Sequence, residues 1–180
     1  MRERAHELVQ RPGTFFTDQI NNPNAISGYE RIGIEILAQL DRPVDVFCGG
    51  VGTAGMLTGV SKRLRESNAD TRIIALEPAS APLLSKGQRG AHRVEGIGIG
   101  MVPPLLQPEA YHEVRAVDES DARTMARRLA REEGILASIS SGLNVAAAVQ
   151  LARELGLGYT VVTVACDSGM KYLAGDLFET

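Results

Sequence analysis

The stretch FCGGVGTAGMLTGV, residues 47–60, runs from an apolar strand-like segment through several glycines into a helix-like segment. Glycine adopts backbone conformations that are closed to other residues, and it lets a ligand approach the backbone closely. A helix that begins near Thr53 would point free N–H groups and partial positive charge toward this loop. The stretch therefore predicts either a site for an anion such as a phosphate, held without any lysine or arginine, or only a tight turn from strand to helix.

The composition is that of an ordinary globular protein, with 180 residues, 44% of them hydrophobic and 23% charged, and a net charge of -3. There is no long basic run and no apolar run of membrane-spanning length, so nucleic-acid and membrane partners are not expected. The N-terminal residues 1–13 are charged and do not resemble a signal peptide, which favours a cytoplasmic location. Cys48 and Cys166 are expected to be buried thiols, and the scattered histidines predict no metal site.

Strand-like and helix-like segments alternate along the chain, and this pattern indicates a parallel sheet with helices on both faces. We expect strands at 14–20, 44–48, 72–78, 112–117, 135–139 and 159–166, and helices at 2–11, 27–40, 53–66, 118–134 and 140–156. Asp118 is expected to cap the helix that follows it. Residues 79–108 are rich in glycine and proline and predict a partly structured, functional region. The fold class is thus three-layer α/β/α with a mostly parallel sheet, and ligands bind such sheets beyond the carboxyl ends of the strands.

A first functional alternative follows from residues 50–55, which match the dinucleotide pattern GxGxxG. Glu77 ends the next predicted strand, where a carboxylate that binds a ribose would be expected. The loop and Glu77 would then form a non-catalytic dinucleotide-binding module.

Several further segments, taken together, carry a more specific signal. GGVGTAG resembles the phosphate loop GVGTGGT, HRVEGIGIGMVP resembles QGIGAGFIP, and EEGILASISSG is very similar to EEGILxGISSG. CDSGMKYL resembles PDSGERYL, and DQINNPNA resembles QFSNPAN. In their order along the chain, from residue 14 to 178, these segments resemble the pyridoxal-phosphate enzymes of the cysteine synthase and cystathionine β-synthase group, which have fold type II.

The resemblance implies roles for particular residues. The residues that would cup the phosphate of pyridoxal 5'-phosphate are Gly52, Thr53, Ala54, Gly55 and Met56. Ser140 aligns with the serine that bonds the pyridine nitrogen, with Ser141 expected to cap the helix. Gln19 aligns with a glutamine near the substrate carboxylate, and Gly96 with a segment on the substrate side of the ring. No catalytic residue and no metal ligand is assigned.

The sequence also departs from the family pattern. Ala54 replaces a glycine, and Met56 replaces a threonine whose hydroxyl would touch the phosphate. The family's cofactor-bearing lysine lies in an SVKDR-like segment that residues 1–180 do not contain. By position, Lys62, Lys86 and Lys171 are expected to be solvated. Residues 1–180 are therefore expected to form one cofactor-binding domain, the C-terminal portion of a longer family chain without its N-terminal lysine-bearing region.

The resemblance implies a β-replacement reaction in which an activated serine such as O-acetylserine combines with sulfide to give cysteine. The chain alone is expected to be inactive. The enzyme is expected to act on a small amino acid and to form either a homodimer or a complex with a partner chain that carries the lysine. A non-catalytic remnant or interaction subunit is the second alternative to the enzyme.

Overall fold

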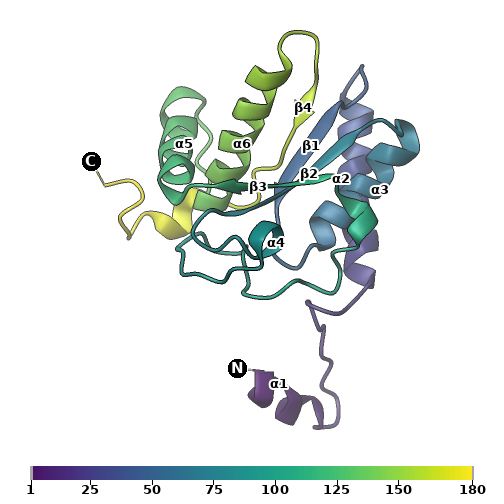
Figure 1. Ribbon diagram of the computed structural model, residues 1–180. Coiled ribbons are helices and arrows are strands. Elements are labelled where there is room, and N and C mark those ends of the chain that lie inside the picture. Colours follow the sequence, from purple (N-terminus) through teal and green to yellow (C-terminus); the bar gives the residue numbers. More distant parts are fainter. Residues whose placement is uncertain (1, 180) are drawn as a thin grey trace.

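A computed structural model of the protein describes residues 2–179. At its centre lies a four-stranded sheet in the order β3–β2–β1–β4, in which all neighbouring strands run parallel (Figure 1). The strands are β1 (Val46–Gly50), β2 (Arg72–Pro78), β3 (Glu113–Val117) and β4 (Val161–Val162). The strand predicted at 72–78 is confirmed at both ends, and those predicted at 44–48 and 112–117 lie within two residues of β1 and β3.

Helices cover both faces of the sheet, which confirms the predicted three-layer α/β/α fold (Figure 1). On one face α2 (Asn24–Gln39) packs against α3 (Gly55–Ser67), and on the other α5 (Glu119–Glu132) packs against α6 (Ile139–Leu155). The remaining helical pieces are α1 (Arg2–Val9), α4 (Leu83–Lys86) and the short 3₁₀ turns η1 (Pro108–Ala110) and η2 (Gly169–Tyr172). The region 79–108 is partly structured, as predicted, because it contains α4.

Successive residues of the central strands point to opposite sides of the sheet and enter two separate cores. Phe47 and Ile73 pack with apolar residues of α2 and α3, whereas Cys48 and Ile74 pack with those of α5 and α6. All four side chains are fully buried. Because both faces of β1 and β2 are covered, these strands are apolar at almost every position instead of at alternate ones.

The strand expected at residues 14–20 is wrong. In the structure this segment joins α1 to α2 without pairing to any described strand, and Phe15 is 82% exposed. The chain turns at Asp18, whose φ is +42°, and the N–H groups of Asn21 and Asn22 donate to the Asp18 carbonyl oxygen. Apolar residues alone do not form a strand without a neighbouring strand to pair with. In Figure 1, α1 lies away from the layered part of the molecule.

Two other strand predictions were too long. Of residues 159–166, only Val161–Val162 form β4, which lies at the edge of the sheet beside β1 and is half-buried instead of covered on both faces. Of residues 135–139, only Ala137 pairs, in a single antiparallel bridge with Ser168. The backbone pairing between β1 and β4 therefore ends at Val162.

The predicted capping residues are also corrected. Asp118 occupies the N-cap position of α5, but its side chain makes no capping hydrogen bond to the helix. Ser138, not Ser141, caps α6, because the Ser138 hydroxyl accepts the N–H of Ser141 at 3.2 Å. Glycines end two helices as predicted, since Gly134 and Gly156 have φ values of +69° and +83°. Within residues 2–179, no helix is both long enough and apolar enough to cross a bilayer.

Candidate active site

The order of the strands places a ligand site at the carboxyl end of β1. From β1 the chain continues to β2 on one side, whereas β4 lies on the other side of β1. In open parallel sheets, loops diverge at such a switch point and leave a crevice between them. Here the diverging loops are the glycine loop, residues 51–54, and the segment that follows β4, residues 163–168.

A cavity of about 500 Å³ lies between these loops, which is within the size range of cofactor sites. Its lining contains seven of the eight residues assigned from the sequence: Gln19, Gly52, Thr53, Ala54, Met56, Gly96 and Ser140. The exception is Gly55, which is buried behind the loop, where a side chain would meet the ring of Tyr29. Gly52 lies against the backbone of Gly96, because a Cβ atom on Gly52 would overlap the Gly96 carbonyl oxygen.

The glycine loop leaves backbone N–H groups available to a ligand. In the described part of the chain, no protein atom accepts a hydrogen bond from the N–H of any residue from Gly52 to Met56. The N-cap residue of α3 is Ala54, which has no side-chain acceptor and sits in the left-handed region at φ +68°. An uncapped helix start of this kind directs N–H groups and the positive end of the helix dipole at an anion. These N–H groups are therefore available to an anion such as the phosphate expected from the sequence, and their role in binding it stays a prediction.

The start of α6 differs, although it faces the same cavity. Ser138 caps the N-terminal end of α6, so the first N–H groups of α6 are less available than those of α3. Ser140 lines the cavity, is 5% exposed, and has its hydroxyl 3.0 Å from the Ser138 hydroxyl. Because a hydroxyl both donates and accepts, Ser140 can bond Ser138 and still offer one further hydrogen bond to a ring nitrogen.

An ion cluster that the sequence analysis did not identify lies at the same cavity. The ammonium of Lys171 is 2.8 Å from an Asp167 carboxylate oxygen and 3.5 Å from a Glu95 carboxylate oxygen. All three residues line the cavity, and the Lys171 side chain, 52% exposed as expected for a solvated lysine, is also paired with these two carboxylates. The hydrogen bond to Asp167 raises the pKa of Lys171 well above its usual range. The amine is thus held charged, which makes it a poor nucleophile.

The two cysteines occupy different environments. Cys48 is buried in the core, and this burial raises the pKa of its thiol to about 11. Cys166 is exposed and lines the cavity, so the expectation that it is buried is wrong. Partial burial of its sulfur and the nearby Asp167 carboxylate raise the pKa of Cys166 as well. Both thiols therefore stay protonated at neutral pH, and neither is activated as a nucleophile.

Asn144 is a further residue of the site that sequence reasoning missed. Its side chain is completely buried and bonds both the end of β1, at Gly50, and the segment after β4, at Val164. A signal for it was present in the sequence. Asn144 lies four residues after Ser140, on the same helical face, in an otherwise apolar run.

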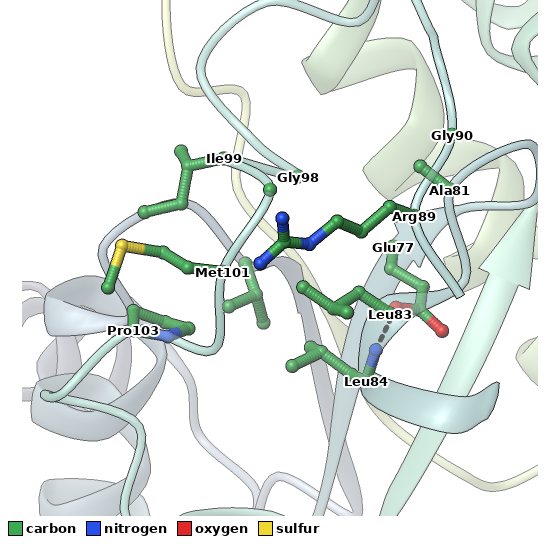
Figure 2. Close-up of a pocket in the computed structure, with 12 residues that line it drawn as sticks. Glu77, Ala81, Leu83, Leu84, Arg89, Gly90, Gly98, Ile99, Met101 and Pro103 are labelled. Carbon is green, nitrogen blue, oxygen red and sulfur yellow. Dashed lines mark hydrogen bonds between the residues drawn. The ribbon is translucent and has the colours of Figure 1, made fainter. Parts of the chain in front are cut away.

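The position of Glu77 does not favour the dinucleotide alternative. Its carboxylate is 2% exposed and accepts hydrogen bonds from the N–H groups of Leu84 and Ser85, so it serves as the cap of α4. Figure 2 shows Glu77 beside Leu84 in a second, small cavity of about 30 Å³, with the guanidinium of Arg89 extending across it. A carboxylate that is buried and already bonded in this way has little capacity left for a ribose hydroxyl.

Comparison with known proteins agrees with the family resemblance found in the sequence. A profile of the family "Pyridoxal-phosphate dependent enzyme" matches residues 1–167. A cysteine synthase from Staphylococcus aureus is 42% identical over 179 residues, which are 98% of this chain and 58% of the relative.

Two solved structures have the same fold. O-ureido-L-serine synthase has a TM-score of 0.93 and 36% identity, over 98% of this chain and 57% of that protein. Cysteine synthase from Entamoeba histolytica has a TM-score of 0.92 and 30% identity, over 98% of this chain and 53% of that protein. The chain thus spans somewhat more than half the length of these relatives.

Proposed function

Because the chain belongs to the family of pyridoxal-phosphate dependent enzymes, we propose that it forms the part of such an enzyme that holds the cofactor's phosphate and ring nitrogen. We propose that residues 1–180 act as one cofactor-binding domain. The observation that carries the proposal is the cavity between the unbonded N–H groups of residues 52–56 and the hydroxyl of Ser140. Had those amides been bonded to protein atoms, with no space in front of Ser140, the proposal would have failed.

In this proposal the N–H groups from Gly52 to Met56 bind the phosphate. Hydrogen bonds to a charged group stabilise by about 1.5–3 kcal/mol each, so several of them hold a phosphate without a cationic side chain. The α3 dipole adds about 0.3–1 kcal/mol. Met56 offers no hydroxyl, so its contribution is limited to its backbone N–H and to apolar contact.

Ser140, Gln19 and Gly96 are assigned to the ring and substrate side of the cavity. When bound, pyridoxal phosphate stabilises negative charge on the substrate carbon next to the amino group. Ser140 is a neutral partner for the ring nitrogen and need not hold it protonated, which favours β-elimination over other outcomes. Gln19 and Gly96 both line the cavity, which supports assigning the Gln19 amide to a substrate carboxylate and Gly96 to a wall without a side chain.

The reaction we propose is β-replacement on an activated serine such as O-acetylserine, with sulfide as the second substrate and cysteine as the product. The names of the relatives cysteine synthase and O-ureido-L-serine synthase support this reaction. Cysteine and O-ureido-L-serine each differ from serine in the group attached to the β-carbon. The alternative in which the chain is a non-catalytic interaction subunit predicts the same fold but no cofactor binding.

We assign the covalent anchor of the cofactor to a lysine outside residues 2–179, in a longer chain or in a partner chain. Two facts support this assignment: the relatives are longer than this chain, and Lys171 is held charged by Asp167. We further propose that the enzyme acts on a small amino acid and forms a homodimer. The cytoplasmic location expected from the sequence stays a prediction.

Thermal unfolding with added ligands tests the proposal. Ligand at 100 times its Kd stabilises a fold by about 2.7 kcal/mol, which corresponds to a rise in Tm of about 5–10 °C at this chain length. We expect such a rise with pyridoxal phosphate and a smaller one with NAD at equal concentration. A larger shift with NAD would favour a dinucleotide module. No shift with either ligand, together with a stable complex with another protein, would favour the interaction subunit.

A further inference from the structure

The two walls of the candidate cavity diverge at the point where the backbone hydrogen bonds between β1 and β4 end. The last paired residues are Phe47 and Val162, and both chains then continue toward the cavity. The Thr163 hydroxyl donates to the Cys48 carbonyl oxygen at 2.7 Å, which extends the contact by one residue. Beyond that point, the spacing between Gly50 and Val164 is not set by any described backbone hydrogen bond.

Asn144 bridges this gap with its side chain. Its Oδ1 accepts the N–H of Gly50 at 2.8 Å, and its Nδ2 donates to the Val164 carbonyl oxygen at 2.9 Å. The Nδ2 atom also lies 3.5 Å from the sulfur of Cys166. Opposite ends of one planar amide are thus bonded to opposite walls, which fixes the distance between them.

The bridging side chain of Asn144 is buried and belongs to a long helix. Asn144 is 0% exposed and lies within α6, one turn after Ser140. In the same helix, the Ser141 hydroxyl accepts the N–H of Cys166 at 2.9 Å and so holds the second wall at another point. Among the described residues, however, only Asn144 bonds both Gly50 and Val164, which both line the cavity.

We propose that Asn144 is a positioning residue that sets the width of the cofactor cavity by tying the end of β1, from which the glycine loop continues, to the segment after β4. Gly50 is two residues before Gly52, where the free N–H groups of the loop begin. A shift of Gly50 therefore moves the proposed phosphate site relative to Ser140. This inference rests on the proposed function, because it assigns Asn144 a task in placing the phosphate.

The test compares Asn144→Leu with Leu151→Ala in the full chain. Leu has a similar size and bonds neither wall, whereas Leu151 is buried in the same helix but away from the cavity. We measure by calorimetry the affinity for pyridoxal phosphate and for pyridoxal, which lacks the phosphate. Asn144→Leu is expected to lower the ratio of the two affinities at least tenfold. Leu151→Ala is expected to lower Tm and leave the ratio unchanged.

Amide hydrogen exchange gives a second readout that needs no ligand. The N–H of Gly50 is expected to exchange slowly in the wild type and in Asn144→Asp, whose carboxylate still accepts this bond, and at least tenfold faster in Asn144→Leu. If Asn144→Leu fails to fold, Asn144→Asp tests the role of Asn144 instead. This variant keeps the acceptor for Gly50 but loses the donor to Val164, so amide exchange should become faster at residues 164–166 alone.

The outcomes separate the two proposals. An unchanged affinity ratio in Asn144→Leu, or a Gly50 amide that stays protected in it, overturns the role of Asn144. A wild-type chain that binds pyridoxal as tightly as pyridoxal phosphate overturns the proposed phosphate site instead, and Gly50 exchange then decides the role of Asn144 alone.

Discussion

Gly52 and Gly96 approach so closely that a methyl group on Gly52 would overlap the carbonyl oxygen of Gly96. The glycine loop and the segment on the proposed substrate side of the cavity are therefore in direct backbone contact. The contact is reinforced next to it, where the N–H of Gly98 donates to the Val51 carbonyl oxygen at 2.9 Å. Any side chain at position 52 would force these two cavity walls apart.

Gly52→Ala is expected to weaken the binding of pyridoxal phosphate at least tenfold and to destabilise the fold by about 1–3 kcal/mol, the usual cost of overpacking. Calorimetry and urea unfolding measure the two effects. Gly28→Ala is the matched control, since a Cβ atom there meets nothing within 4 Å and lies in α2. The control should stabilise by about 0.5–1 kcal/mol. Equal binding by the two variants would contradict the account.

Ala54→Gly is expected to leave the free energy of unfolding unchanged or raise it by up to about 1 kcal/mol. Ala54 has a φ of +68°, a left-handed conformation that costs a residue with a Cβ atom about 1–2 kcal/mol. The matched control is Ala148→Gly within α6, which should cost about 1 kcal/mol. Urea unfolding compares them, and equal destabilisation by both would show that position 54 carries no strain.

Lys171 is expected not to form a stoichiometric adduct when the chain is treated with pyridoxal phosphate and borohydride at pH 7. Only an uncharged amine forms the imine that borohydride reduces, and the pairing with Asp167 raises the pKa of Lys171. Lys62 is also expected to remain without a stoichiometric adduct, because its ammonium is paired with a Glu30 carboxylate oxygen at 2.8 Å and it does not line the cavity.

Asp167→Asn is the informative variant for this experiment. It removes the closest carboxylate from Lys171, so more of the amine is uncharged and labelling at Lys171 should increase, as measured by peptide mass spectrometry. A complete, site-specific adduct on Lys171 in the wild type would refute the view that the anchoring lysine lies elsewhere.

Stability is expected to fall as pH drops through the range in which His112 titrates. Burial lowers the pKa of His112, and the neighbouring Arg65 guanidinium, 3.2 Å from its Nδ1, lowers it further. The Nδ1 atom also accepts the N–H of Ile73 at 2.9 Å, which requires the neutral ring.

Because the folded-state pKa lies below the ordinary value of about 6.5, the unfolded chain binds the proton more readily. The contribution of neutral His112 to the free energy of unfolding is fully present above about pH 6.5 and is lost as pH falls through the folded-state pKa of His112. In urea unfolding at pH 8, 7, 6 and 5, His112→Asn should show a smaller decline than the wild type. Identical slopes for the two proteins would rule out His112 as the source.

Much of the architecture could be predicted because the decisive signals are local. The apolar run at 72–78 forms β2, and the glycines after β1 lead into α3. Ser140 lies on the cavity with the glycine loop because parallel strands bring their carboxyl ends, and the loops beyond them, to one edge of a sheet.

The errors arose where the outcome depends on tertiary partners. Residues 159–166 are apolar enough for a long strand, but backbone pairing stops at Val162, and side chains make the next contacts, with Thr163 bonding Cys48 and Asn144 bonding Val164. Glu77 suited a ribose site by position in the sequence, but α4 folds back onto its carboxylate. Ser138 and Ser141 are both plausible caps by residue type, and only the actual start of α6 at Ile139 decides between them.

The central claim is that backbone N–H groups at the start of α3 bind the phosphate of pyridoxal phosphate. Amide chemical shifts of the ¹⁵N-labelled chain, recorded while pyridoxal phosphate is added, test this claim most directly. We expect large, saturable shifts at residues 52–56, with much smaller ones when pyridoxal replaces pyridoxal phosphate. Saturable binding that leaves the amides of residues 52–56 unshifted would contradict the account.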